Sequence, residues 1–299
     1  MRALKSILVV VDPSGNNETL IAKARALARQ NGASIELFLC DADHAYSLGR
    51  TYETASVETA RQACLLQART HLQRWRGEVE TQGIKVTTDV ACESPLYQGI
   101  VRKVLSSRPD LVMKSITPAY GSSRYILDPN DWQLMRACPA QLLLVRPRVW
   151  SAAPHVLAAV DVSDGEAPEI TASIMRAGEL LALGRHENLH VAFCEEVAQV
   201  PSEPRVSASR LERLAHEYQL DRQKVYALSG DPGAQLLAFA NGGEYDILAL
   251  GALTHRLGLV ALVGTLTTHL ADGFSGDLLL VKPEAQTLSM SSVLENAMW

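Results

Sequence analysis

The chain repeats itself at long range, and this internal repeat constrains the fold more than any other feature. Three apolar segments of the first half recur in the same order in the second half: 7–12 in 156–161, 110–113 in 246–249, and 141–147 in 277–283. The first pair is offset by 149 residues (161 − 12) and the other two by 136 (246 − 110 and 283 − 147), which indicates a deletion in the second copy. A repeat of about 140 residues is too long for a solenoid unit. We infer two copies of one domain.

Within each copy, short apolar runs alternate with longer amphipathic stretches. The runs lack the two-residue alternation of half-exposed strands, which is typical of strands buried on both faces; examples are 7–11, 142–145 and 278–281. The stretches between them carry apolar residues at helical spacing: 20–29, 60–79, 170–183 and 209–216. Each copy is therefore predicted to be an α/β domain with an open, mainly parallel five-stranded sheet and helices on both faces. We expect domains at 1–147 and 153–284, a short linker at 147–154 and a polar tail at 285–299.

Charge and cysteine content narrow the classes of function. The net charge is −5, with 28 basic and 33 acidic residues and no run of Lys or Arg, so neither a nucleic acid nor a membrane surface is an expected partner. The five cysteines form no C-x-x-C pair, which argues against a disulfide framework and a structural zinc site. No cleavage signal and no apolar segment of about 18 residues is found, so we expect a cytoplasmic protein.

A candidate ligand site lies where loops follow the strands of the second copy, because open parallel sheets bind ligands at the carboxyl ends of their strands. Asp161 ends the first expected strand and is placed to accept a hydrogen bond from a ribose or a base. Gly251 follows a later strand, and Gly264-Thr265 is expected to start a helix whose N-terminus attracts phosphate. His255 and Arg256 add positive charge to the same loop.

These features resemble a universal stress protein domain. The shared features are a first strand ending in Asp, the turn Gly230-Asp231-Pro232, the glycine loop after a strand, and a closing apolar strand followed by Lys/Arg-Pro. The resemblance covers 4–147 and 153–284 and is strongest to the tandem, E-type members. It implies an adenine-nucleotide alpha-hydrolase-like, Rossmann-like fold and a role in the stress response through binding, with ATP and Mg²⁺ as the expected ligand of the second copy.

The match to the family's phosphate-binding pattern G-x-x-G-x(9)-G-[ST] is incomplete. In the second copy Gly251, Gly264 and Thr265 fit, whereas Thr254 replaces the second glycine. In the first copy the four positions are occupied as follows: Ser115, Pro118, Asp128 and Pro129. Proline supplies no backbone donor and Asp128 repels phosphate. We therefore expect no family-type triphosphate site in the first copy, despite Asp12 at its strand end, and a less charged ligand is the hypothesis there.

Structural roles remain open for the same residues. Asp12 and Asp161 suit the capping of a following helix or turn, Gly251 suits a simple turn, and His255 suits a solvated loop. His186 and His190 have a spacing that fits zinc on a helix, but His190 begins an expected strand, so no metal is predicted. Cys138, before a buried strand, is expected to be a structural thiol.

No catalytic constellation is found: G-x-S-x-G, G-x-G-x-x-G and the P-loop motif are all absent from the sequence. We therefore expect a binding protein rather than an enzyme, with a weak nucleotide hydrolase and a scaffold with two vestigial sites as the alternatives. The closing strands 141–145 and 277–281 are apolar and would be exposed at a sheet edge. The resemblance implies pairing through this edge, so we expect the two copies to form an intramolecular pseudo-dimer.

Overall fold

The structure is a computed structural model that describes residues 4–13, 15, 17–42, 54–116, 127–162, 168–195, 206–252 and 265–282. The chain divides into two compact units, which we call the N-terminal unit (Arg2–Arg148) and the C-terminal unit (Val149–Gln286). Within the described residues no helix is both long and apolar enough to cross a membrane.

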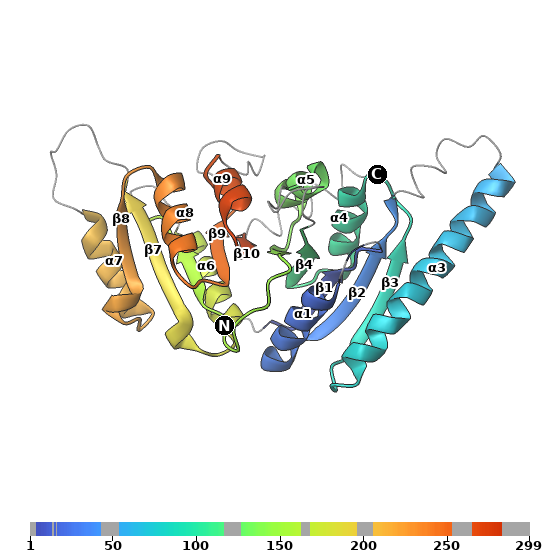
Figure 1. Cartoon of the computed structure of the whole chain (residues 1–299), viewed down its shortest axis with the longest axis horizontal. Coiled ribbons are helices and arrows are strands. Elements are labelled where there is room, and N and C mark those ends of the chain that lie inside the picture. Colours follow the sequence, from blue (N-terminus) through green and yellow to red (C-terminus); the bar gives the residue numbers. More distant parts are fainter. Residues whose placement is uncertain are drawn as a thin grey trace. The chain divides into compact units, whose positions relative to one another are not determined.

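The N-terminal unit is a parallel sheet in the order β3-β2-β1-β4-β5 (Figure 1). Its elements are β1 (Ser6–Val10), α1 (Glu18–Asn31), β2 (Ser34–Cys40), α3 (Thr54–Glu80), β3 (Val86–Ala91), α4 (Leu96–Ser107), β4 (Leu111–Ser115), α5 (Pro129–Ala137) and β5 (Gln141–Val145). Helices α1 and α3 pack against each other, and so do α4 and α5. Helix α1 ends because Gly32 adopts a left-handed conformation (φ 66°), and its N–H donates to the carbonyl of Ala28.

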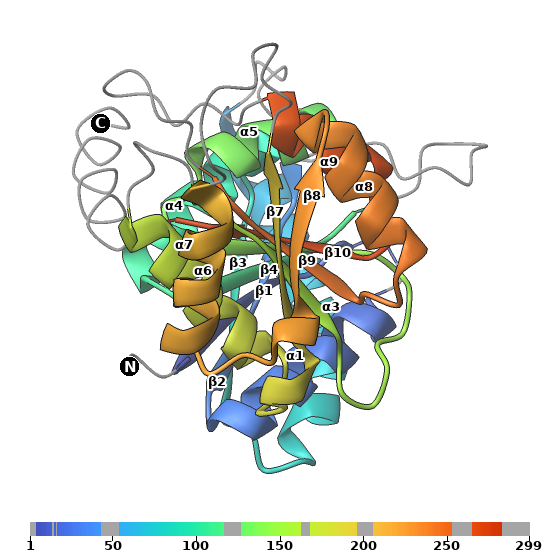
Figure 2. The same cartoon turned by 90° about the vertical axis from the view of Figure 1, so that its left-hand side faces the viewer.

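The C-terminal unit has the same order of parallel strands, β8-β7-β6-β9-β10. Its elements are β6 (Val156–Ala159), α6 (Pro168–Leu181), η1 (His186–Asn188), β7 (Leu189–Glu195), α7 (Val206–Glu217), η2 (Arg222–Lys224), β8 (Val225–Ser229), α8 (Pro232–Gly242), β9 (Ile247–Gly251), α9 (Thr265–Gly273) and β10 (Asp277–Val281). Figure 2 shows α6 and α7 on one side of the strands and α8 and α9 on the other.

The expected α/β architecture is confirmed in both units: five parallel strands with helices on both faces. The central strands are buried throughout, as their continuous apolar sequence requires; Leu8 and Val9 of β1 and Leu248 of β9 have no exposed surface. In its own unit β5 pairs with β4, and β10 pairs with β9. The expectation that β5 and β10 also pair with each other stays a prediction.

The spacing of the repeat is visible in the element bounds. β9, α9 and β10 each begin 136 residues after β4, α5 and β5, and each has the same length as its counterpart. Earlier in the chain the offset is larger, because β7 begins 155 residues after β2 (189 − 34). The offset changes at the helix that follows β2 in the N-terminal unit and β7 in the C-terminal unit. This helix has 27 residues in the first case (α3) and 12 in the second (α7). The deletion inferred from the sequence therefore lies in this region.

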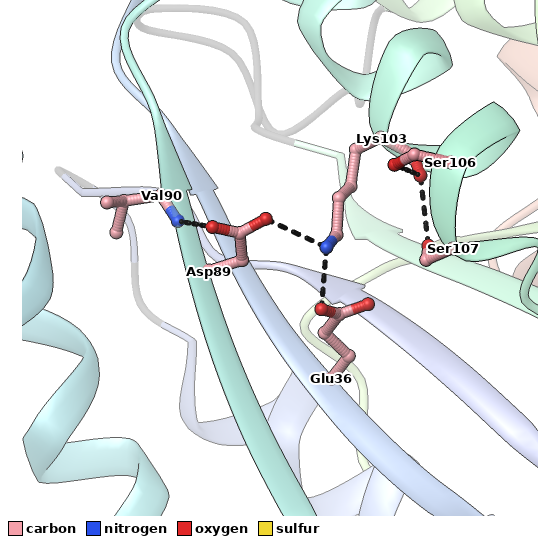
Figure 3. Close-up of polar contacts among 6 residues, drawn as sticks. All are labelled: Glu36, Asp89, Val90, Lys103, Ser106 and Ser107. Carbon is pink, nitrogen blue, oxygen red and sulfur yellow. Dashed lines mark hydrogen bonds and ion pairs between the residues drawn. The ribbon is translucent and has the colours of Figure 1, made fainter.

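One face of the outer strands in the N-terminal unit is held to α4 by an ionic network (Figure 3). The ammonium group of Lys103 lies 2.6 Å from the Oε1 atom of Glu36 on β2 and 2.8 Å from the Oδ2 atom of Asp89 on β3. Burial lowers the pKa of Lys103, but the hydrogen bonds to Asp89 and Glu36 outweigh it and raise the pKa above its usual value. Because Phe38 pairs with Asp89 in the sheet, Glu36, Phe38 and Asp89 share the face that α4 covers.

The repeated aspartate before β4 and β9 has the same structural role in both units. Asp110 accepts hydrogen bonds through Oδ2 from the backbone N–H groups of Lys5 and Ser6, each at 2.9 Å. Asp246 accepts through Oδ2 from the backbone N–H of His155 at 3.0 Å and from the hydroxyl of Ser151 at 2.7 Å. Each carboxylate thus fixes the start of one central strand to the start of its neighbour, at the amino edge of the sheet. The repeated position of these two aspartates is a property of the scaffold.

Replacing Asp246 with alanine is expected to lower the free energy of unfolding by about 1–3 kcal/mol, because the partly buried N–H of His155 loses the acceptor that the buried carboxylate of Asp246 provides. Urea denaturation followed by circular dichroism measures this change. Ser151→Ala is the matched control, since it removes one donor and leaves the carboxylate bonded to the backbone. An Asp246→Ala protein as stable as Ser151→Ala would show that the carboxylate does not hold the two strands.

Candidate functional site

The predicted site of the C-terminal unit lies at the carboxyl edge of β6 and β9. These two strands are neighbours, and the strand order reverses between them, which is where ligands bind in open parallel sheets. Asp161 follows β6 by two residues and is exposed, and Gly251 is the last residue of β9 and is partly exposed. The structure therefore brings these two predicted residues to the strands that flank the reversal point.

Gly251 packs closely against a helix. A Cβ atom at this position would lie 3.0 Å from Cγ1 of Ile170 and 3.5 Å from Cδ1 of Ile174, both on α6. A larger residue would crowd these two side chains at the carboxyl end of β9. The glycine of the motif thus has a packing role beside the ligand-binding role that the sequence suggested.

The helix expected at Gly264-Thr265 is present, because α9 begins at Thr265. The remaining loop residues of the prediction, Thr254, His255, Arg256 and Gly264, lie outside the described residues, as does the side chain of Thr265. The described part of the site therefore consists of two strand ends and the first residue of one helix.

The aspartates after the first strands are held by hydrogen bonds of their backbone groups. The carbonyl of Asp161 accepts a hydrogen bond of 3.4 Å from the hydroxyl of Thr171 on α6. In the N-terminal unit, the backbone N–H of Asp12 donates to Oδ1 of Asn17, and its carbonyl accepts from Nδ2 of Asn17 at 2.8 Å. Asn17, not Asp12, occupies the N-cap position of α1. Of the structural alternatives for Asp12, the turn therefore applies and the helix cap does not.

In the N-terminal unit, two carboxylates, those of Asp128 and Asp131, lie at the equivalent place, where α5 begins beside the end of β4. Asp128 caps α5: its Oδ1 accepts from the backbone N–H of Asp131 at 2.7 Å, and Oδ2 of Asp131 accepts from the N–H of Asp128 at 3.3 Å. Lys114, at the end of β4, donates from Nζ to Oδ1 of Asp131 at 2.6 Å and to the carbonyl of Ser115 at 3.2 Å. Burial raises the pKa of Asp131 above its usual value, and Lys114 opposes this shift.

This arrangement does not suit a phosphate group at the N-terminus of α5. The amide that an anion would use is already bonded to Asp128, and two carboxylates contribute negative charge there. The position of Asp128 is the one that Gly264 holds in the C-terminal unit, while Pro118 lies outside the described residues. The two units therefore carry different residues at the place where the predicted phosphate-binding loop joins its helix.

The two histidines considered as zinc ligands have separate partners. His186 lies in η1, where Nδ1 is 3.6 Å from Oε1 of Glu179 and Nε2 is 3.4 Å from the carbonyl of Gln219. His190 lies on β7, as expected, with Nδ1 2.9 Å from the hydroxyl of Tyr245. Among the described residues, no group of three or more His, Cys, Asp or Glu side chains is placed to hold a metal ion.

Sequence reasoning missed a cluster that contains two cysteines. Cys64 of α3 donates a hydrogen bond of 3.4 Å to Oδ2 of Asp41, which follows β2 directly beside Cys92 at the end of β3. The three residues come from segments separated by more than twenty positions, so no local motif announces the cluster. Cys138, in contrast, is fully buried and its thiol donates to the carbonyl of Ala140, as expected of a structural thiol.

Comparison with known proteins finds a matching family model, curated relatives of similar length and solved structures of similar fold. Residues 3–146 match the model of the universal stress protein family. Universal stress protein E of Photorhabdus laumondii is 24% identical over 304 residues, which cover 95% of this chain and 96% of the relative. A solved structure of a putative universal stress protein from Pseudomonas aeruginosa is 23% identical, covers 97% of this chain and 98% of that chain, and has a TM-score of 0.76. A universal stress protein from Archaeoglobus fulgidus has a TM-score of 0.71 at 13% identity and covers 93% and 98%.

Proposed function

Because the chain belongs to the universal stress protein family, we propose that it acts in the stress response of the cytoplasm by binding small molecules and partners rather than by catalysis. We assign adenine-nucleotide binding to the C-terminal unit alone. The carboxyl edge of β6 and β9 is the proposed site, with Asp161 accepting a hydrogen bond from the ribose or base. The N-terminus of α9, with Gly264 and Thr265, receives the phosphates, and Thr254, His255 and Arg256 complete the loop.

One observation supports this division of roles more than any other. Helices α5 and α9 occupy equivalent places in the two units, but the residue before α5 is an aspartate bonded to the helix, whereas the residue before α9 is a glycine. A glycine leaves the first amides of a helix open to an anion, and a capping carboxylate occupies one of them. The N-terminal unit is then a structural half or binds a less charged ligand.

A thermal-shift titration with ATP and Mg²⁺ tests the proposal. A ligand at about 100 times its dissociation constant stabilises the protein by roughly 2.7 kcal/mol, so the melting temperature should rise with dose. Gly264→Asp copies the side chain of the N-terminal unit and should abolish the rise. Asp161→Ala should weaken binding about tenfold or more, as the loss of a hydrogen bond to a charged group predicts.

The matched control is Asp12→Ala, which changes the equivalent residue of the N-terminal unit and should leave the ATP-dependent shift unchanged. No shift up to millimolar ATP would refute nucleotide binding and leave the scaffold as the function. Release of phosphate from ATP well above background, lost in Asp161→Ala, would replace the binding role by a hydrolase.

A further inference from the structure

The N-terminal unit contains a pair of thiols beside a carboxylate, at the carboxyl edge of β2 and β3 and away from the strand reversal. Cys92 directly follows β3, and Asp41 directly follows β2. The backbone N–H of Asp41 donates to the carbonyl of Ala91 at 2.9 Å, which fixes these two strand ends side by side. Cys64 reaches them from α3, which packs along β2 and β3 (Figure 1).

Strand geometry places the cluster on one face of the sheet. Cys40 pairs with Ala91, and Cys40 lies against Gly99 of α4, so these residues face α4. The next residue of each strand, Asp41 and Cys92, then faces the opposite side, where α3 lies. This agrees with the hydrogen bond between Cys64 and Asp41, which brings the Cys64 thiol to the side of the sheet that Cys92 faces.

The two thiols differ in access to solvent. Cys64 is 4% exposed, whereas Cys92 is partly exposed. Burial, together with the hydrogen bond to Asp41, raises the pKa of Cys64 to about 12, so Cys64 keeps its proton at neutral pH. Cys92 is therefore the thiol that a small oxidant from solvent meets first, and Cys64 is the thiol beside it that has a proton acceptor in contact.

We propose that Cys92 and Cys64 form a reversible disulfide when the protein meets a peroxide. The sulfur of Cys92, as the thiolate, attacks one oxygen of hydrogen peroxide: an S–O bond forms, the O–O bond breaks, and the leaving hydroxide takes up the proton that Cys92 has released, which gives a sulfenic acid and one water. The sulfur of Cys64 then attacks the sulfur of Cys92, the S–O bond breaks, and hydroxide leaves. Asp41 accepts the proton of Cys64 and passes it to the hydroxide, which makes the second water. Two thiols are oxidised and one peroxide is reduced.

Peptide mapping of the full-length protein tests this assignment. The protein is treated with hydrogen peroxide, quenched with catalase, alkylated and digested with trypsin without reduction. Each cysteine of the region then lies on its own peptide: 30–50 for Cys40, 62–69 for Cys64 and 86–102 for Cys92. The expected product is a crosslink between 62–69 and 86–102, with three of the five cysteines still alkylated, and dithiothreitol should restore all five.

Variants separate the two steps. Cys92→Ser should abolish the crosslink, and Cys64→Ser should leave a sulfenic acid on Cys92 that dimedone labels. Asp41→Asn should increase dimedone labelling of Cys92 and slow the crosslink. Cys138→Ser is the matched control and should behave as the wild type, because its thiol is buried elsewhere. Three results for the wild-type protein would each overturn the proposal. They are a crosslink through Cys40, a crosslink between two chains, and oxidation of Cys92 to a sulfinic acid while Cys64 remains free to be alkylated.

Discussion

Replacing Asp131 with alanine is expected to lower the free energy of unfolding by about 3–5 kcal/mol, the range for breaking a buried ion pair from one side. The carboxylate is 2% exposed and the side chain of its partner Lys114 is 10% exposed, so the substitution leaves a buried ammonium group with the Ser115 carbonyl as its remaining described partner. Urea denaturation monitored by circular dichroism gives the change. Since small proteins are stable by roughly 5–15 kcal/mol, one unpaired buried charge would remove a large share of the stability of this unit.

Asp128→Ala is the matched control for Asp131→Ala. It removes the cap of α5 but leaves Lys114 paired, so a loss of about 1 kcal/mol is expected. The double variant Lys114→Met/Asp131→Leu should recover most of the stability, because apolar residues of similar size replace both charges. Equal losses for Asp131→Ala and Asp128→Ala would mean that capping, and not the buried charge, explains the effect.

Replacing Phe38 with alanine is expected to cost about 3–5 kcal/mol, because it opens a cavity in the packed interface between β2 and α4. The ring is 1% exposed, and the ammonium group of Lys103 lies 5.9 Å from its centroid. The loss of the ring therefore removes packing between β2 and α4 as well as the contact with the charge of Lys103. The midpoint of urea denaturation and the melting temperature should both fall.

Phe38→Leu distinguishes volume from the aromatic contact. Leucine fills most of the space, so a loss below about 1.5 kcal/mol is expected. If Phe38→Ala and Phe38→Leu were equally stable, the neighbouring side chains would have to close the space, and the packing explanation would be wrong.

The fold is predictable because its signals are long and repeated. The buried strands appear as continuous apolar runs, and the recurrence of 141–147 in 277–283 is enough to match β5 with β10. The repeated aspartate of the amino edge is visible as a pattern, but its role is not, because Asp110 bonds to Lys5 and Ser6 more than a hundred residues away.

The candidate site is predictable only in outline. Asp161, Gly251 and the start of α9 follow from strand and helix signals, whereas the packing of Gly251 under Ile170 depends on the approach of a helix. In the N-terminal unit Asp128 is expected from its charge to repel an anion, but the capping box with Asp131 and its link to Lys114 depend on tertiary contacts. The cluster of Cys64 with Cys92 is also a tertiary contact, which spacing alone does not reveal.

The constant offset of 136 residues also bears on how such a chain diversifies. From β4 to β5 and from β9 to β10 the two units have strands and helices of equal length, joined by segments of equal length. The blocks 111–145 and 247–281 have the same length and the same order of elements. Recombination could therefore exchange one block for the other without inserting or deleting residues. Each half of the chain carries a second version of the edge at which we propose ligand binding, so a single recombination event would transfer the proposed specificity to the other half or erase it.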